Sequence, residues 1–93
     1  MKIRYVGHAK KRMLLRNVQE FQVVKVLLGP TETIKSKQEI DRYLSYRFFD
    51  YVKEYNTTRF LVVVHTDKTI EPINIISTIL KTRNELKIDG FNL

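Results

Sequence analysis

The apolar and polar positions in the first third of the chain predict one strand followed by two helices. Residues 2–6 alternate between polar and apolar side chains, as a short strand does. Residues 8–16 are good helix formers with no β-branched member, and Asn17 suits a helix end because asparagine tolerates a left-handed backbone. A second helix is predicted over residues 20–28, where Phe21, Val24, Leu27 and Leu28 have the spacing of one buried stripe. The following Gly29-Pro30 ends that helix.

The pattern changes to strands in the second half. Residues 59–66 are dense in β-branched side chains and present apolar groups to both faces, which is typical of a central strand. Residues 73–80 predict another strand, with Pro72 acceptable at its start. Residues 83–93 are expected to run along the surface.

Two interpretations of residues 36–56 remain open. Ser36 and Glu39 have the spacing of a helix capping box, and the apolar positions that follow fit a helical repeat. The rival interpretation is a strand over 42–52 that forms a hairpin with 59–66. The periodicity slightly favours the helix.

Composition bounds the class of protein. The chain has 93 residues, 43% hydrophobic and 29% charged, which indicates a single globular domain over residues 1–93. It contains no cysteine, so disulfides and thiolate metal sites are excluded, in keeping with a reducing compartment. No long apolar run or signal-peptide core is present, so we expect a cytoplasmic protein with no membrane contact.

The basic charge is concentrated at one end of the sequence. Seventeen Lys and Arg stand against ten Asp and Glu, for a net charge of +7. Residues 1–30 hold seven basic groups and one acidic group, and therefore supply +6 of that total. Such a distribution suggests a polyanion partner, although a solubilising surface charge would give the same count.

Candidate chemistry lies on the first predicted helix. A spacing of four places His8, Arg12 and Arg16 in one row, beside a row of Ala9 and Met13 that would face the core. Histidine transfers protons near neutral pH, and arginine offers a donor fork that suits phosphate. The alternative to a functional site is that these side chains form a solvated edge of the helix, and the pattern alone favours this alternative.

The same residues carry a resemblance to a known family. The motif His8-Ala9-x-x-Arg12-Met13-x-x-Arg16 resembles the opening of a family of small bacterial and archaeal domains of unknown function. Those domains are similar to RelE/ParE toxins and to the barnase–EndoU–colicin–RelE group of metal-independent ribonucleases. The resemblance covers about residues 3–83, with departures at Asn17, in a longer loop after Tyr46, and at Ile76-Ser77-Thr78.

The resemblance implies an α+β fold. An N-terminal short strand and two helices would pack on a twisted antiparallel sheet of three to four strands, as in RelE. It also moves residues 42–49 toward a strand, against their periodicity.

The resemblance further implies an endoribonuclease that needs no metal or cofactor. The ribose 2′-OH would attack the adjacent phosphate, with His8 as base or acid and with Arg12 and Arg59 stabilising charge. The implied catalytic residues are His8, Arg12, Tyr46, Arg59 and Thr78, and the implied RNA-binding residues are Lys10, Lys11, Arg16, Arg47 and Lys81. Its partners would be RNA, free or on the ribosome, and an acidic antitoxin.

Each of these residues also has a structural alternative. Tyr46 would be a core aromatic, and Arg47 and Arg59 would pair across strands with Asp41, Asp50 or Glu54. His65 would be a packed histidine. The corresponding alternatives for the whole protein are a non-catalytic module that binds nucleic acid or a partner protein, and an accessory subunit that forms oligomers.

Overall fold

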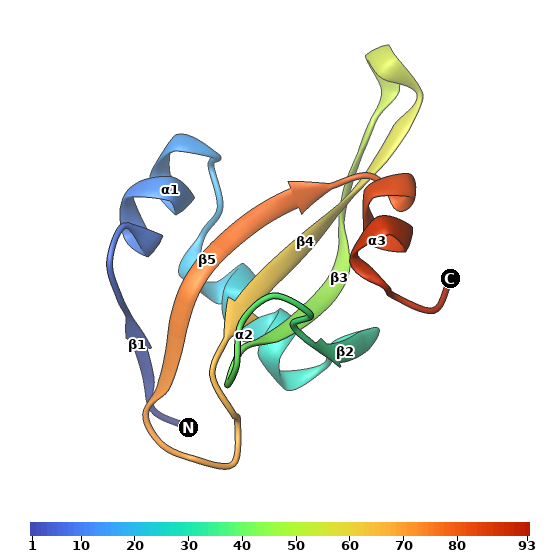
Figure 1. Ribbon diagram of the computed structural model, residues 1–93. Coiled ribbons are helices and arrows are strands. Elements are labelled where there is room, and N and C mark those ends of the chain that lie inside the picture. The colour runs from blue at the N-terminus through green and yellow to red at the C-terminus, as the bar shows by residue number, and fades with distance from the viewer.

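The structure, a computed structural model describing residues 1–93, is an α+β fold with three helices and a five-stranded mixed sheet (Figure 1). The strand order is β1-β5-β4-β3-β2, with β1 parallel to β5 and every other pair antiparallel. The elements in chain order are β1 (Ile3–Tyr5), α1 (Ala9–Leu15), α2 (Glu20–Leu28), β2 (Glu32–Lys35), β3 (Tyr43–Val52), the 3-10 helix η1 (Lys53–Tyr55), β4 (Thr57–His65), β5 (Ile73–Lys81) and α3 (Arg83–Asp89).

The sheet is larger than the sequence predicts. Three to four antiparallel strands were expected, whereas five are present and one pair is parallel. The additional strand is β2, which pairs with residues 43–46 of β3. It is only four residues long, so its alternation of exposed and half-buried side chains is too brief to stand out in the sequence.

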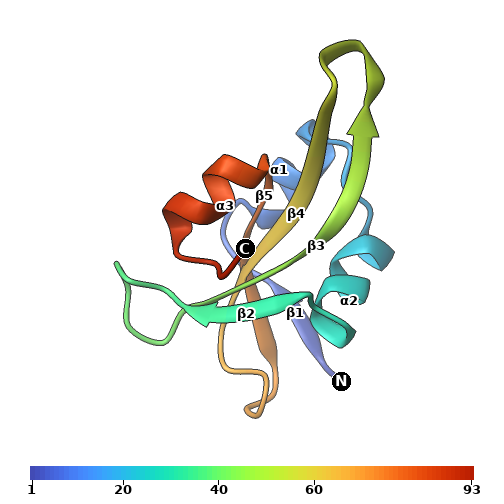
Figure 2. The same cartoon turned by 90° about the vertical axis from the view of Figure 1, so that its right-hand side faces the viewer.

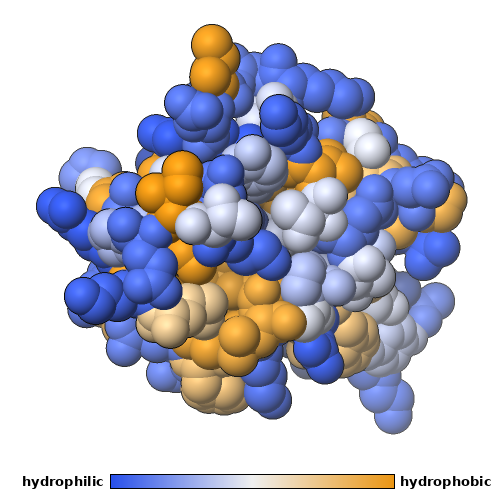
Figure 3. All heavy atoms as spheres, turned by 90° about the horizontal axis from the view of Figure 1, so that it is seen from below, coloured by the Kyte–Doolittle hydropathy of each residue, from blue (hydrophilic) through white to orange (hydrophobic).

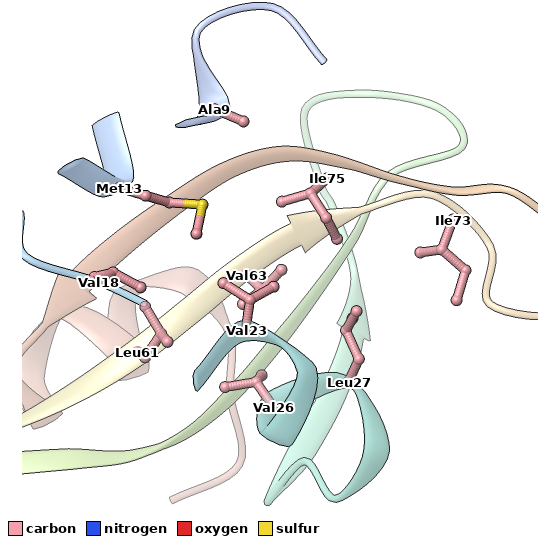
Figure 4. Packing of buried hydrophobic residues seen from close by; sticks show 10 residues of the cluster. All are labelled: Ala9, Met13, Val18, Val23, Val26, Leu27, Leu61, Val63, Ile73 and Ile75. Atoms are coloured by element: carbon pink, nitrogen blue, oxygen red, sulfur yellow. The ribbon is translucent and has the colours of Figure 1, made fainter. Parts of the chain in front are cut away.

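The sheet is covered on both faces because its central strand is apolar on both. Leu61 and Val63 of β4 pack in a cluster with α1 and α2, whose side chains point toward the sheet in Figure 4. Val62, between them, belongs to a second cluster on the opposite face with Tyr46 and Leu86. Figure 2 shows the resulting layers, with α1 and α2 on one side of the sheet and α3 on the other.

Residues 43–52 form a strand, so the helical interpretation of this region is wrong. β3 buries neighbouring side chains on opposite faces, as at Ser45 and Tyr46, and this two-sided burial imitates a helical stripe in the sequence. Ser36 does act as a cap, but of a turn: its Oγ accepts hydrogen bonds from the amides of Gln38 and Glu39. Asp41, with φ of 61°, then turns the chain into β3.

The C-terminal segment is a packed helix and does not simply run along the surface. Thr82 and Glu85 form a reciprocal capping box at the start of α3, and Gly90, with φ of 104°, ends the helix. Leu86 and Phe91 are buried against the sheet. Within α3 only Leu86 is buried against the sheet. Because one apolar position cannot show a helical repeat, the periodicity of the sequence did not indicate this helix.

None of the three helices is long or apolar enough to cross a membrane.

Packing of α3 can be tested by removing its buried side chain. Leu86→Ala should lower the free energy of unfolding by about 2–5 kcal/mol, because it leaves a cavity against β3 and β4. Ile88→Ala is the matched control, since Ile88 lies in the same helix but is 81% exposed, and it should change stability by less than about 0.5 kcal/mol. Urea unfolding measures both values, and equal effects of the two substitutions would contradict the packing described.

Candidate nucleic-acid interface on the first helix

Helix α1 is held on the sheet by one apolar side and presents basic side chains beside it. Ala9 and Met13 are buried in the core cluster. His8 stands at the start of the helix, and Asn17, with φ of 56°, ends it by reversing the chain toward α2. His8, Arg12 and Arg16, here called the basic row, are all exposed.

The two arginines of the basic row reach across to β5. The Arg12 Nη1 lies 3.4 Å from the hydroxyl oxygen of Ser77, to which it donates. The Arg16 Nη1 donates to the main-chain oxygen of Thr78 at 2.5 Å. Strand β1 pairs only with residues 73–75, so these side chains lie along the part of β5 that β1 leaves uncovered. Both guanidiniums are therefore oriented by uncharged acceptors, and neither is paired with a carboxylate.

Few of the cations in the first thirty residues have an acidic partner. The ion pairs of the whole chain involve Lys10, Arg42, Arg59, Lys81 and the N-terminal amine. Only one of the seven basic side chains before residue 31 is in that set: Lys10, whose Nζ lies 3.7 Å from Glu20. The remaining six have no carboxylate within 4 Å. Three of them lie on β1 and α1, and Arg16 stands at the end of α1. The excess charge of the sequence is thus an uncompensated charge on the surface.

Thr78 lies beneath this surface, in the interior. It is fully buried, and its hydroxyl oxygen has no hydrogen-bond partner. Its main-chain oxygen, rather than its side chain, contacts the basic row. Ser77, which the sequence did not single out, supplies the side-chain contact; its only signal was its place beside Thr78 in the last strand.

Tyr46 is on the other face of the sheet from α1. It is buried between Phe60 and Phe91, with edge-to-face ring contacts to both. Burial is the main cause that raises the pKa of its hydroxyl, and the carboxylate of Glu32 adds to it. A site that contains His8 and Arg12 therefore does not include Tyr46.

Arg59 is engaged in the β3–β4 hairpin. Its guanidinium donates two hydrogen bonds to Asp50, at 2.8 and 2.6 Å, and lies over the ring of Phe49. The same bonds hold the pKa of the Asp50 carboxyl below its usual value. This is the cross-strand pair that the sequence offered as the alternative role of Arg59. The pair neutralises the cation, which leaves no free charge there for a phosphate.

The remaining basic candidates are dispersed. Lys11 is exposed on α1 without an ion pair, close to the basic row in sequence. Arg47 donates to the main-chain oxygen of Gly29 at 3.1 Å, at the end of α2. Lys81 is paired with Asp89 of α3 at 2.5 Å. The structure thus brings Arg12 and Arg16 beside Ser77 and Thr78, with His8 at the start of the same helix. It places Tyr46, Arg47, Arg59 and Lys81 elsewhere.

No group of three or more His, Asp or Glu side chains has the geometry to hold a metal ion.

No family model, curated protein or solved structure matches this chain. The candidate site therefore rests on its own geometry.

A second polar cluster, around His65, is interior. Ser45 Oγ lies 2.7 Å from His65 Nε2, and His65 Nδ1 lies 2.7 Å from the main-chain oxygen of Thr66. Because a carbonyl only accepts, Nδ1 carries the proton and Ser45 donates to Nε2. Both residues are buried, so the serine–histidine pair is inaccessible to a substrate. Burial is the main cause that lowers the pKa of His65, and the nearby Lys68 lowers it further.

This histidine should make stability depend on pH. In the unfolded chain His65 has its ordinary pKa of about 6.5, whereas burial lowers this pKa in the folded chain. Stability from His65 is therefore complete above about pH 6.5 and is lost as the pH falls toward the lower folded-state pKa, by at most about 1.4 kcal/mol per pH unit. Urea midpoints between about pH 7.5 and 5.5 should show this decline, and His65→Gln should flatten it. An unchanged slope in that variant would assign the dependence to other groups.

Proposed function

We propose that this protein binds RNA through the basic row of α1. One observation carries the proposal: Arg12 and Arg16 are held against β5 by a hydroxyl and a carbonyl, with no carboxylate to neutralise them. From His8 to Arg16 the row extends roughly 12 Å along the helix, enough to follow more than one phosphate of a strand. Oriented, unneutralised guanidiniums are donors suited to phosphate oxygens.

The relation to RelE-like proteins forms part of the same proposal. It is supported by two N-terminal helices that pack on the same face of a largely antiparallel sheet. The parallel strand β1 and the packed helix α3 go beyond the arrangement expected from that resemblance. An acidic antitoxin would be accepted by the same uncompensated cations, because its carboxylates would replace the phosphates.

Salt dependence is the first test of RNA binding. Replacing Arg12 and Arg16 together by Gln should weaken binding of a labelled single-stranded RNA and should reduce the slope of log K against log salt by about 1.4, since each lost phosphate contact removes about 0.7. The matched control replaces Arg83 and Lys87 by Gln, which removes the same charge from exposed positions of α3. Fluorescence anisotropy over a salt series measures both. Equal losses in the two double variants would show a response to net charge alone.

Cleavage of the bound RNA is a second candidate function, favoured by the position of His8. Its exposed imidazole caps no amide of α1 and lies one helical turn from Arg12. It is therefore available to act as a base on a ribose 2′-OH or as an acid on a leaving oxygen. Arg12 would stabilise the charge on the phosphate, without contributions from Tyr46 or Arg59.

Incubation with RNA in EDTA tests this second function. Wild-type protein should produce fragments with 2′,3′-cyclic phosphate ends, and His8→Ala should slow their formation by roughly 10²- to 10⁴-fold. Tyr46→Phe is the control, because its hydroxyl lies on the opposite face, and it should cleave at the wild-type rate. Wild-type protein that binds free and ribosome-bound RNA but leaves both intact would exclude cleavage and retain binding.

A further inference from the structure

A groove lined by aromatic and basic side chains runs between α2 and β3. Its volume is about 260 Å³, and Leu61 of the central strand contributes to its lining. Phe21 and Lys25 line it from α2, and Arg47 and Phe48 from β3. The register of β3 shifts between Phe48 and Asp50, and two consecutive phenylalanines, Phe48 and Phe49, thereby contribute to the lining.

Two of these phenylalanines are largely exposed to solvent. Phe21 is 60% exposed and Phe48 is 59% exposed, although large aromatic side chains ordinarily contribute most when buried. Seen from below, the surface has one area in which apolar side chains gather among hydrophilic ones (Figure 3). Helix α2, in the lower half of Figure 1, exposes two large apolar side chains, Phe21 and Leu28. Strand β2 pairs only with residues 43–46, so the edge of β3 from Arg47 onward is free of a neighbouring strand.

The groove is positively charged. Lys25 Nζ lies 5.6 Å from the centroid of the Phe21 ring, and Arg47 is fixed at the end of α2 by its bond to Gly29. Neither cation has a carboxylate within 4 Å. The nearest acids along the chain, Glu20 and Asp50, are paired with Lys10 and Arg59. An occupant must therefore offer both a flat apolar surface and negative charge.

We infer that this groove binds an unpaired base of single-stranded RNA. Phe21 and Phe48 offer ring surface for stacking, while Lys25 and Arg47 contact the adjoining phosphates. A volume below that of most drug-sized sites suits one ring system. The groove lies on the side of the sheet that α1 and α2 cover, so a strand held by the basic row can continue toward it. A duplex keeps its bases stacked inside and cannot use the groove.

The inference rests on the proposed RNA-binding function and adds selectivity for single strands to it. Phe21→Ala and Phe48→Ala should each weaken binding of single-stranded RNA by roughly 5- to 150-fold and leave the salt slope unchanged. Phe48→Tyr should restore wild-type affinity because a ring remains. Tyr55→Ala is the matched control, an aromatic residue that is 76% exposed at the tip of the hairpin. Urea unfolding verifies that each variant is folded.

Two further RNAs separate the groove from the basic row. A strand of abasic residues keeps the phosphates and lacks the bases, so wild type and Phe48→Ala should bind it equally, and more weakly than wild type binds the normal strand. A duplex should also bind both proteins equally. If Phe21→Ala and Phe48→Ala bind the normal strand as wild type does, while the Arg12 and Arg16 variant binds weakly, the inference fails and the proposed function stands.

A mononucleotide tests the groove without the basic row. Adenosine monophosphate should shift the NMR signals of Phe21 and Phe48 in the wild type and in the Arg12 and Arg16 variant, whereas ribose 5-phosphate should not. If adenosine monophosphate causes these shifts but replacing Arg12 and Arg16 leaves the RNA affinity unchanged, the proposed role of α1 is rejected and the base site is retained. Shifts caused instead by a poly-glutamate peptide, or by raising the protein concentration, would replace RNA with an acidic peptide or a second copy and overturn the inference.

Discussion

Strand β4 must bury side chains on both of its faces, and the other elements are placed by that requirement. Leu61 and Val63 need a cover on one side, which α1 and α2 supply. Val62 needs a cover on the other, which Leu86 and Phe91 supply together with Tyr46. Each buried side chain of this size contributes about 1.5–3 kcal/mol when it leaves water. A chain of 93 residues has few such groups, so neither layer is dispensable.

The two-sided sheet also decides which functional groups meet. The helix that carries His8 and Arg12 covers one face, and Tyr46 is buried on the other. The sheet therefore separates residues to which the family resemblance assigned one catalytic site. Arg59 is on the hairpin, where Asp50 neutralises it. What remains on the α1 side is positive charge that, apart from Lys10, has no acidic partner.

The sequence predicted the elements whose signals are local. Helix α2 begins and ends where expected, since Gly29-Pro30 marks its end, and α1, β4 and β5 agree within two residues. The predicted stripe of α2 was wrong in part: Val23, Val26 and Leu27 are buried, whereas Phe21 and Leu28 are exposed. Strand β3 was undecided since two-sided burial and a helical stripe place apolar residues alike. Strand β2 and α3 were missed because each depends on contacts from distant parts of the chain, such as Leu86 against the sheet.

The site followed the same division. The spacing of four follows from helix geometry, and in the structure Arg12 lies within α1 while His8 and Arg16 stand at its two ends. The contact of Ser77 depends on how helix and strand meet, which no short motif shows. The sequence offered Asp50 only as one of three acidic partners for Arg59, and the strand register selects it. The aromatic groove joins α2 to a bulged part of β3, and nothing in the separate segments indicates that they meet.

The parallel pairing of β1 with β5 has a consequence for how the protein is made. Ile3 sits opposite Ile73, so the edge of the sheet closes through a contact between residues separated by most of the chain. Contacts of such high sequence separation form late, since a long loop must first be closed. During synthesis α1 leaves the ribosome long before its docking strand β5 does. The cations of α1 can therefore reach their ordered positions against β5 only after residues 73–81 have also been made.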